Sequence, residues 1–281
     1  MTSPAPDPWR PGLDYEAHGD GYTGRRQTDA RIAAHVHRAL GDARTVLNVG
    51  AGAGSYEPTD RHVIAIEPSA TMRAQRPPGL VPAIAARAEA LPLDDDAVDA
   101  AMAMLTVHHW DDPLAGLREL RRVARSPVVI LTFDAQALGR FWLMDDYAPE
   151  LLEDERRRFP AIADIVAGLG GARAEAIPVP RDCRDGIGEA YYARPEAFLD
   201  PAVRGAQSAW PRLGPGVEER IVTGSPATSP RAPGMSATGT CATGPNGTAP
   251  CASWCRRQAD WRRAAPARSG PTRRVRRRRP R

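Results

Sequence analysis

Three alternating glycines and one acid follow two predicted strands, at positions where a ligand-binding loop requires such residues. Three glycines occupy alternate positions: Gly50, Gly52 and Gly54. They directly follow Val46–Val49, a short run that is apolar apart from Asn48 and predicts a buried strand, and a second apolar run, Val63–Ile66, is followed by Glu67. Glycine carries no Cβ, and parallel strands end at a common edge of their sheet. The pattern predicts a nucleoside pocket at that edge, with the Glu67 carboxylate reaching ribose hydroxyls.

The spacing of the glycines separates two kinds of nucleotide site. Dinucleotide-binding loops follow the pattern G-x-G-x-x-G, whereas Ser55 stands here at the place of the third glycine and the pattern is G-x-G-x-G. Together with Glu67, residues 45–58 (TVLNVGAGAGSYEP) resemble the class I S-adenosylmethionine-dependent methyltransferases, in particular the small-molecule branch called methyltransferase type 11. An ordinary strand-to-helix turn is the alternative interpretation of the glycines.

The resemblance covers roughly residues 28 to 200 and implies a fold, a cofactor and a reaction. It implies an α/β fold with a Rossmann-like, doubly wound and mostly parallel sheet that has helices on both faces. It also implies S-adenosylmethionine as the cofactor, and in-line transfer of its methyl group to a small-molecule acceptor whose reacting atom (O, N, C or S) stays open. The alternatives are a nicotinamide-dependent dehydrogenase, against which Ser55 argues, and a catalytically inactive nucleotide-binding module.

The resemblance also assigns cofactor-binding residues. The three glycines would contact the methionine part and the sugar, Glu67 the ribose, and Glu89, which follows the third predicted strand, the adenine amino group. Asn48 stands where the family commonly has Asp; it keeps an oxygen acceptor but loses the charge that would attract the cofactor's ammonium group. For Glu89 the alternative is a solvated acid in a loop.

Two histidines are candidates for acid–base chemistry. His108 and His109 follow the fourth predicted strand, at the sheet edge where open α/β folds bind ligands. Either could act as a general base near neutral pH, or simply line the pocket. No metal site is expected, because no histidine follows the pair Cys251 and Cys255.

Hydrophobic periodicity predicts the elements that position these residues. Helices are expected at residues 30–40, capped by Thr28 or Asp29, at 70–75, and from 113 to 125 with Leu114 and Leu117 facing inward. Further strands are expected at residues 81–86, 98–105, 127–133 and 172–179.

Later residues are candidates for a substrate site. Four large side chains could line a substrate pocket or simply pack in the core: Phe141, Trp142, Met144 and Tyr147. The polar loop that follows Val179, with Gly186 and Gly188, could be a lid, and Cys183 within it is not expected to be a nucleophile. Four residues of the N-terminal arm could reach the cofactor, or decorate an exposed loop: Tyr15, Tyr22, Arg25 and Arg26.

Charge divides the chain into an acidic body and a basic tail. Of 38 basic and 34 acidic residues, 13 Arg and one acid, Asp260, lie from Gly224 onward, so the tail carries +12 and the first 223 residues −8. We expect an irregular arm (1–27), a methyltransferase domain (28–223) and a disordered tail (224–281). The tail is either a genuine basic segment or the product of a shifted reading frame, because the usual last antiparallel strand is not evident in it.

Composition bounds partners and location. An acidic body is a poor ligand for polyanions, so a nucleic acid partner is expected only if the basic tail is genuine. A small-molecule substrate and a monomer or homodimer are expected. There is neither an apolar run of 18 residues nor an apolar leader, and the predicted location is cytoplasmic.

Overall fold

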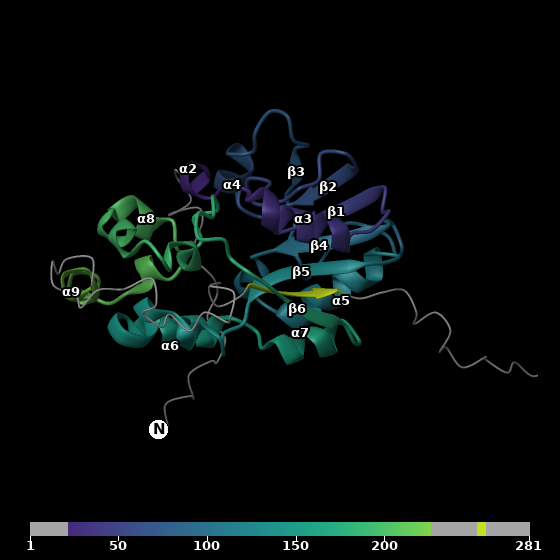
Figure 1. Ribbon diagram of the computed structural model, residues 1–281. Coiled ribbons are helices and arrows are strands. Elements are labelled where there is room, and N and C mark those ends of the chain that lie inside the picture. The colour runs from purple at the N-terminus through teal and green to yellow at the C-terminus, as the bar shows by residue number, and fades with distance from the viewer. Residues whose placement is uncertain (1–21, 226–251, 257–281) are drawn as a thin grey trace, which may run out of the picture.

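The fold is a seven-stranded sheet with helices on both faces (Figure 1). The computed structural model describes residues 22–225 and 252–256. The strand order is β3-β2-β1-β4-β5-β7-β6, and the pairs from β3 to β5 are parallel. The strands are β1 (Thr45–Val49), β2 (His62–Ile66), β3 (Ala83–Ile84), β4 (Ala100–Met104), β5 (Val128–Phe133), β6 (Arg173–Ile177) and β7 (Ala252–Arg256).

The chain order reverses between β1 and β4. From β1 the sheet grows outward through β2 and β3 on one side and through β4 and β5 on the other. In open α/β sheets a ligand binds at such a switch point, outside the carboxyl ends of the strands. The glycine loop after β1 and the histidines after β4 both lie there, so the predicted Rossmann-like, doubly wound fold is confirmed.

Side chains that alternate along the strands form two cores. Val46, Met102 and Leu131 pack with α3 (Ala30–Ala39), which covers one face, as Figure 1 shows. Leu47, Ala101 and Ile130 belong to the opposite core. That face is covered by α5 (Pro113–Val123) and α7 (Ile162–Gly168), while α4 (Ala70–Ala74) follows β2.

A second group of short helices, here called the cap (residues 138–159 and 187–225), lies to one side of the sheet, together with α2 (Tyr22–Arg25) (Figure 1). Its longer helices are α6 (Pro149–Arg158), α8 (Pro201–Gly205) and α9 (Val217–Gly224). Single turns complete it: η2 (Leu138–Arg140), η3 (Leu143–Tyr147, π-helical), η4 (Gly188–Tyr191), η5 (Pro195–Leu199) and η6 (Trp210–Arg212). A further turn, η1 (Val107–His109), follows β4. No helix in the described part of the chain is long and apolar enough to cross a bilayer.

One prediction about the sheet is wrong. The last antiparallel strand was expected to be missing, but Ala252–Arg256 form β7, which pairs antiparallel with both β5 and β6. The prediction relied on the scarcity of Leu, Ile and Phe in the tail, whereas strands pair through backbone groups, and a Ser-Trp-Cys segment is compatible with that pairing. The support that a missing strand lent to a shifted reading frame is lost with that prediction.

Smaller differences concern the ends of elements. The third strand has two residues, and the fourth begins at Ala100, because Val98 forms only an isolated bridge with Ala124. Leu114 was expected to face inward but is 46% exposed, since the buried stripe of α5 runs through Leu117 and Leu120 instead. Asp29, one of the two cap residues predicted for the first helix, caps α3, and Ser69 caps α4. Of the tail that was expected to be disordered, Ala252–Arg256 form β7 instead, while residues 226–251 and 257–281 lie outside the described residues, as do residues 1–21 of the arm that was expected to be irregular.

Candidate active site

The glycine loop is fixed by its backbone and by two protein neighbours. All three glycines have positive φ: 67° at Gly50, 50° at Gly52 and 96° at Gly54. A Cβ on Gly50 would lie 2.1 Å from Thr106 Oγ1, and one on Gly54 would lie 2.2 Å from Leu80 Cδ1. At Gly52 the nearest group is the Met72 methyl, 3.3 Å away. Two of the glycines therefore make room for protein side chains.

The Glu67 carboxylate points at this loop, as its predicted role requires. It is 7% exposed and accepts hydrogen bonds from Gly52 N (2.8 Å) and Ser69 N (2.9 Å). Burial raises the pKa of Glu67, and the two backbone N–H groups oppose that rise. Each carboxylate oxygen keeps a further lone pair, so both can still accept from a ligand hydroxyl.

A buried ion pair beside β1 accounts for Asn48. Its Nδ2 donates to Glu57 Oε1 (2.9 Å), and Arg76 pairs with Glu57 at 2.8 Å and donates to Gly52 O at 3.2 Å. An aspartate at position 48 would place two carboxylates in contact, whereas an amide can donate. Neither Glu57 nor Arg76 was identified from the sequence. The available signal was an acid, Glu57, shortly after the glycines, together with a basic residue after the second strand, Arg76, that could pair with it.

Glu89 lies between the third strand and α5. Its side chain is 19% exposed, accepts from Asp112 N (3.1 Å) and lies 3.9 Å from the Arg87 guanidinium. These contacts hold it at the start of α5, beside the carboxyl edge of the sheet. Its assignment to adenine stays a prediction.

A partly open cavity of about 60 Å³ lies where the sheet meets the cap. Its lining combines aromatic and ionisable side chains: Phe133, Phe141, Trp210, His108, Glu155 and Glu189. Of the predicted wall, Phe141 and Met144 line the cavity, and Trp142 packs edge-on against Phe141 and Tyr147. The predicted lid loop contributes Gly188 and its neighbours.

One strained segment joins the glycine loop to the cavity. Leu105 has φ 54° and lines the cavity, Thr106 packs on Gly50, and His108 lines the cavity again. A left-handed leucine costs on the order of 1 kcal/mol and persists only when its surroundings hold it. Here β5 does so, since Leu105 N donates to Leu131 O at 2.7 Å.

Comparison with known proteins agrees with this geometry. Residues 47–131 match the family model described as a methyltransferase domain. A solved structure described as a methyltransferase from an antibiotic biosynthesis pathway of Anabaena variabilis is 26% identical, with a TM-score of 0.73, over 83% of this chain and 99% of that one. The chain therefore contains a methyltransferase domain, and its sequence and fold resemble those of class I S-adenosylmethionine-dependent methyltransferases.

Other solved methyltransferases are less similar to this methyltransferase. One from Thermotoga maritima is 22% identical, with a TM-score of 0.48, over 58% of this chain and 84% of that chain. One from Aquifex aeolicus is 24% identical, with a TM-score of 0.40, over 51% and 80%. No curated protein matched the sequence significantly.

The residues around the loop suit the methyl donor that the methyltransferase family implies. Asn48 is 1% exposed, and its Oδ1 finds no hydrogen-bond partner among the described residues. A buried acceptor of this kind suits an ammonium group. The Glu67 carboxylate is held at Gly52, the glycine of the loop with the most open surroundings.

Both candidate histidines of the methyltransferase lie on η1 and are neutral at pH 7. Burial, with the nearby Arg158 and Arg26, lowers the pKa of His109 to about 3, and burial with His109 beside it lowers the pKa of His108. The His108 ring stacks on Phe159 with centroids 4.0 Å apart. Neutral, stacked imidazoles suit hydrogen bonding better than proton uptake, and their catalytic role stays a prediction.

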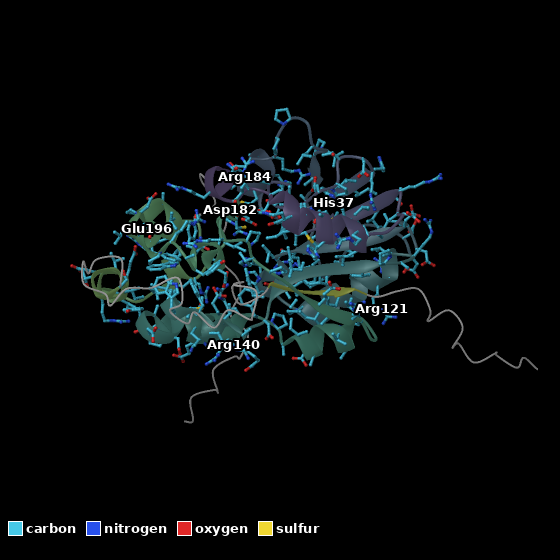
Figure 2. The ribbon with its side chains drawn as sticks, viewed as in Figure 1. His37, Arg121, Arg140, Asp182, Arg184 and Glu196 are labelled. Atoms are coloured by element: carbon cyan, nitrogen blue, oxygen red, sulfur yellow. The ribbon has the colours of Figure 1, made fainter. Side chains whose placement is uncertain are left out.

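The segment before α3 fastens the cap to the body of the methyltransferase. Arg26 pairs with Asp185 at 2.6 Å, and Tyr56 Oη donates to the same carboxylate at 2.7 Å. Asp29 accepts from Arg184 N, and Figure 2 shows Arg184 and Asp182 together beside α3. Arg25 and Arg26 thus contact the cap and its loop, while Tyr15 lies outside the described residues.

Cys183 is 5% exposed, and burial raises the pKa of its thiol to about 12. A thiol of that pKa is not a nucleophile at neutral pH.

Proposed function

We propose that this methyltransferase binds S-adenosylmethionine at the glycine loop and methylates a small-molecule acceptor in the adjacent cavity. The observation that carries the proposal is the segment 105–108, which packs on Gly50 through Thr106 and lines the cavity through Leu105 and His108. A methyl group bound at the loop would therefore be a short distance along this segment from an acceptor in the cavity.

The cofactor would supply a methyl group already activated on a cationic sulfonium. The chain's own residues have three tasks. Glu67 accepts from the ribose hydroxyls, Asn48 Oδ1 accepts from the ammonium group, and Glu89 selects the base. The cap keeps water out and holds the acceptor in line, which is how binding geometry lowers a bimolecular barrier.

The shape and charge of the site support a small molecule as acceptor. The cavity is concave and lined by phenylalanine and tryptophan rings, as small-ligand sites commonly are. The first 223 residues carry a net charge of −8, which disfavours a nucleic acid.

Calorimetric titration with S-adenosylhomocysteine tests the cofactor site. We expect micromolar binding, weakened in Glu67→Ala by about 1–3 kcal/mol, because that variant loses a charged acceptor beside hydroxyl groups. The matched control is Glu196→Ala, an exposed glutamate on the cap (Figure 2) that should leave binding unchanged. Equal affinity in the wild type and Glu67→Ala would remove Glu67 from the site, and no binding to the wild type would overturn the proposed function.

A further inference from the structure

Glu155 is a buried carboxyl group that the cofactor site does not use. It lies on α6, is 8% exposed and lines the cavity. Its Oε1 pairs with Arg158 at 2.9 Å, while its Oε2 has no hydrogen-bond partner within residues 22–225 and 252–256. A buried carboxylate oxygen without a donor indicates that a ligand provides one.

A second buried polar atom borders the same cavity from the sheet side. His108 is 4% exposed, and its Nδ1 finds no hydrogen-bond partner in the described part of the chain. The ring is neutral at pH 7, so this nitrogen either accepts or donates one hydrogen bond. The cavity therefore offers unfilled polar positions from α6 and from η1, between aromatic walls.

The charges around the cavity favour a cation. The acids are Glu155, Glu189, Asp154 and Asp185, and the bases that pair with them or face the cavity are Arg26, Arg158 and Arg212, with neutral His108 and His109. A bound ammonium group would favour the ionised forms of both glutamates, and in those forms the acids exceed the arginines by one charge, which the ammonium group balances. Aromatic faces also attract such a cation.

We propose, resting on the proposed function, that the methyl acceptor is a small amine and that Glu155 is the catalytic carboxylate that holds its N–H group and takes its proton. The bonds balance. One N–H bond is exchanged for an N–C bond, the released proton moves to Glu155 Oε2, and the donor's sulfur keeps the electron pair of the broken S–C bond.

The acidity of Glu155 suits this step. Burial raises the pKa of Glu155 to about 7 and that of Glu189 to about 8. A carboxylate that titrates near neutral pH can accept a proton and release it to solvent in the next cycle.

The test compares Glu155→Gln with Glu153→Gln, an exposed glutamate on the same helix that pairs with Arg157. Methyl transfer from labelled S-adenosylmethionine is measured for ethylamine, other small primary and secondary amines, and the corresponding alcohols. We expect methylated amines in preference to alcohols. We expect kcat to fall about 100-fold or more in Glu155→Gln. Glu153→Gln should match the wild type, and Glu155→Asp should recover part of the loss. In the wild type, kcat/KM should rise as the pH increases through about 7, and this rise should be absent in Glu155→Gln.

A second readout does not depend on turnover. With S-adenosylhomocysteine present, the carboxyl carbon of Glu155 is titrated by NMR with and without ethylamine. We expect the amine to lower the apparent pKa of Glu155, and ethanol to leave it unchanged.

The outcomes distinguish the two proposals. Loss of S-adenosylhomocysteine binding in the wild type would overturn the proposed function itself. If S-adenosylhomocysteine binds normally, three results would overturn only the amine acceptor and the role of Glu155. They are methylation of alcohols, equal rates in Glu155→Gln and Glu153→Gln, and the absence of both amine methylation and a shifted carboxyl titration.

Discussion

The two halves of the candidate site are built in opposite ways. Apart from Glu89, the cofactor side comes from neighbouring stretches of sequence: the loop after β1, the end of β2 and the region of α4 all lie between residues 45 and 76. The acceptor side draws on residues scattered from Arg26 to Trp210. The first half depends on backbone conformation, whereas the second depends on how distant side chains pack.

That difference has a chemical counterpart. At the loop, polar groups are paired locally, as Glu67 is with two backbone N–H groups and Glu57 is with Arg76. In the cavity, burial dominates, and it shifts the pKa of Glu155 and Glu189 upward and that of both histidines downward. The loop thus has a fixed conformation with locally paired polar groups, while the cavity holds groups whose protonation state a ligand can change.

Gly50→Ala should have the largest effect, because it disturbs the backbone conformation on which the glycine loop depends. The variant combines a left-handed φ with an overlap against Thr106, and we expect a loss of about 3 kcal/mol in the free energy of unfolding. Urea denaturation measures it. Gly79→Ala is the control, since no described atom lies within 4 Å of that position and its change should be small. Equal stability of the two variants would show that the loop is less constrained than its geometry indicates.

The contrast also explains what sequence could predict. Alternating glycines and a strand-terminal acid are a local pattern, so the loop and the position of Glu67 followed from it, and the mostly parallel sheet followed from the family resemblance that it carries. Glu155 sits in an ordinary charged run, ELLEDERRR, and nothing in that run distinguishes it from exposed Glu153. Its burial arises in the folded protein, where Phe159 at the end of α6 stacks on His108 after β4, a contact between distant segments. β7 escaped prediction for the same reason, since its partners β5 and β6 are far away in sequence.

Glu189→Gln tests the effect of burial in the cavity, through the pH dependence of protein stability. Burial raises the pKa of Glu189 from 4.5 to about 8, with Glu155 and Asp185 adding to it and Arg26 opposing it. The folded protein therefore keeps a proton that the unfolded chain releases, so this stabilisation is fully present below pH 4.5 and is lost as pH rises through 8. Relative to the wild type, the variant should be nearly unchanged at pH 4.5, more stable by about 2 kcal/mol at pH 6, and more stable still at pH 9. Calorimetric Tm values against pH measure the difference, with Glu153→Gln as the exposed control.

A difference between Glu189→Gln and the wild type that does not change with pH would mean that Glu189 is not desolvated. The cavity would then be wetter than its lining indicates, and the contrast with the loop would weaken.

Glu89→Ala should have the smallest effect, because this residue belongs to the loop side yet is partly exposed. Its loss removes one acceptor from Asp112 N and, as we assign it, one from the adenine amino group. S-adenosylhomocysteine should bind less tightly by under about 1 kcal/mol. The sharper readout is discrimination: the wild type should prefer S-adenosylhomocysteine to S-inosylhomocysteine, which lacks the amino group, and the variant should bind the two alike. If the preference survives in Glu89→Ala, the base is selected by backbone groups, and the cofactor half would then rest on backbone conformation even where its sequence offers a side chain.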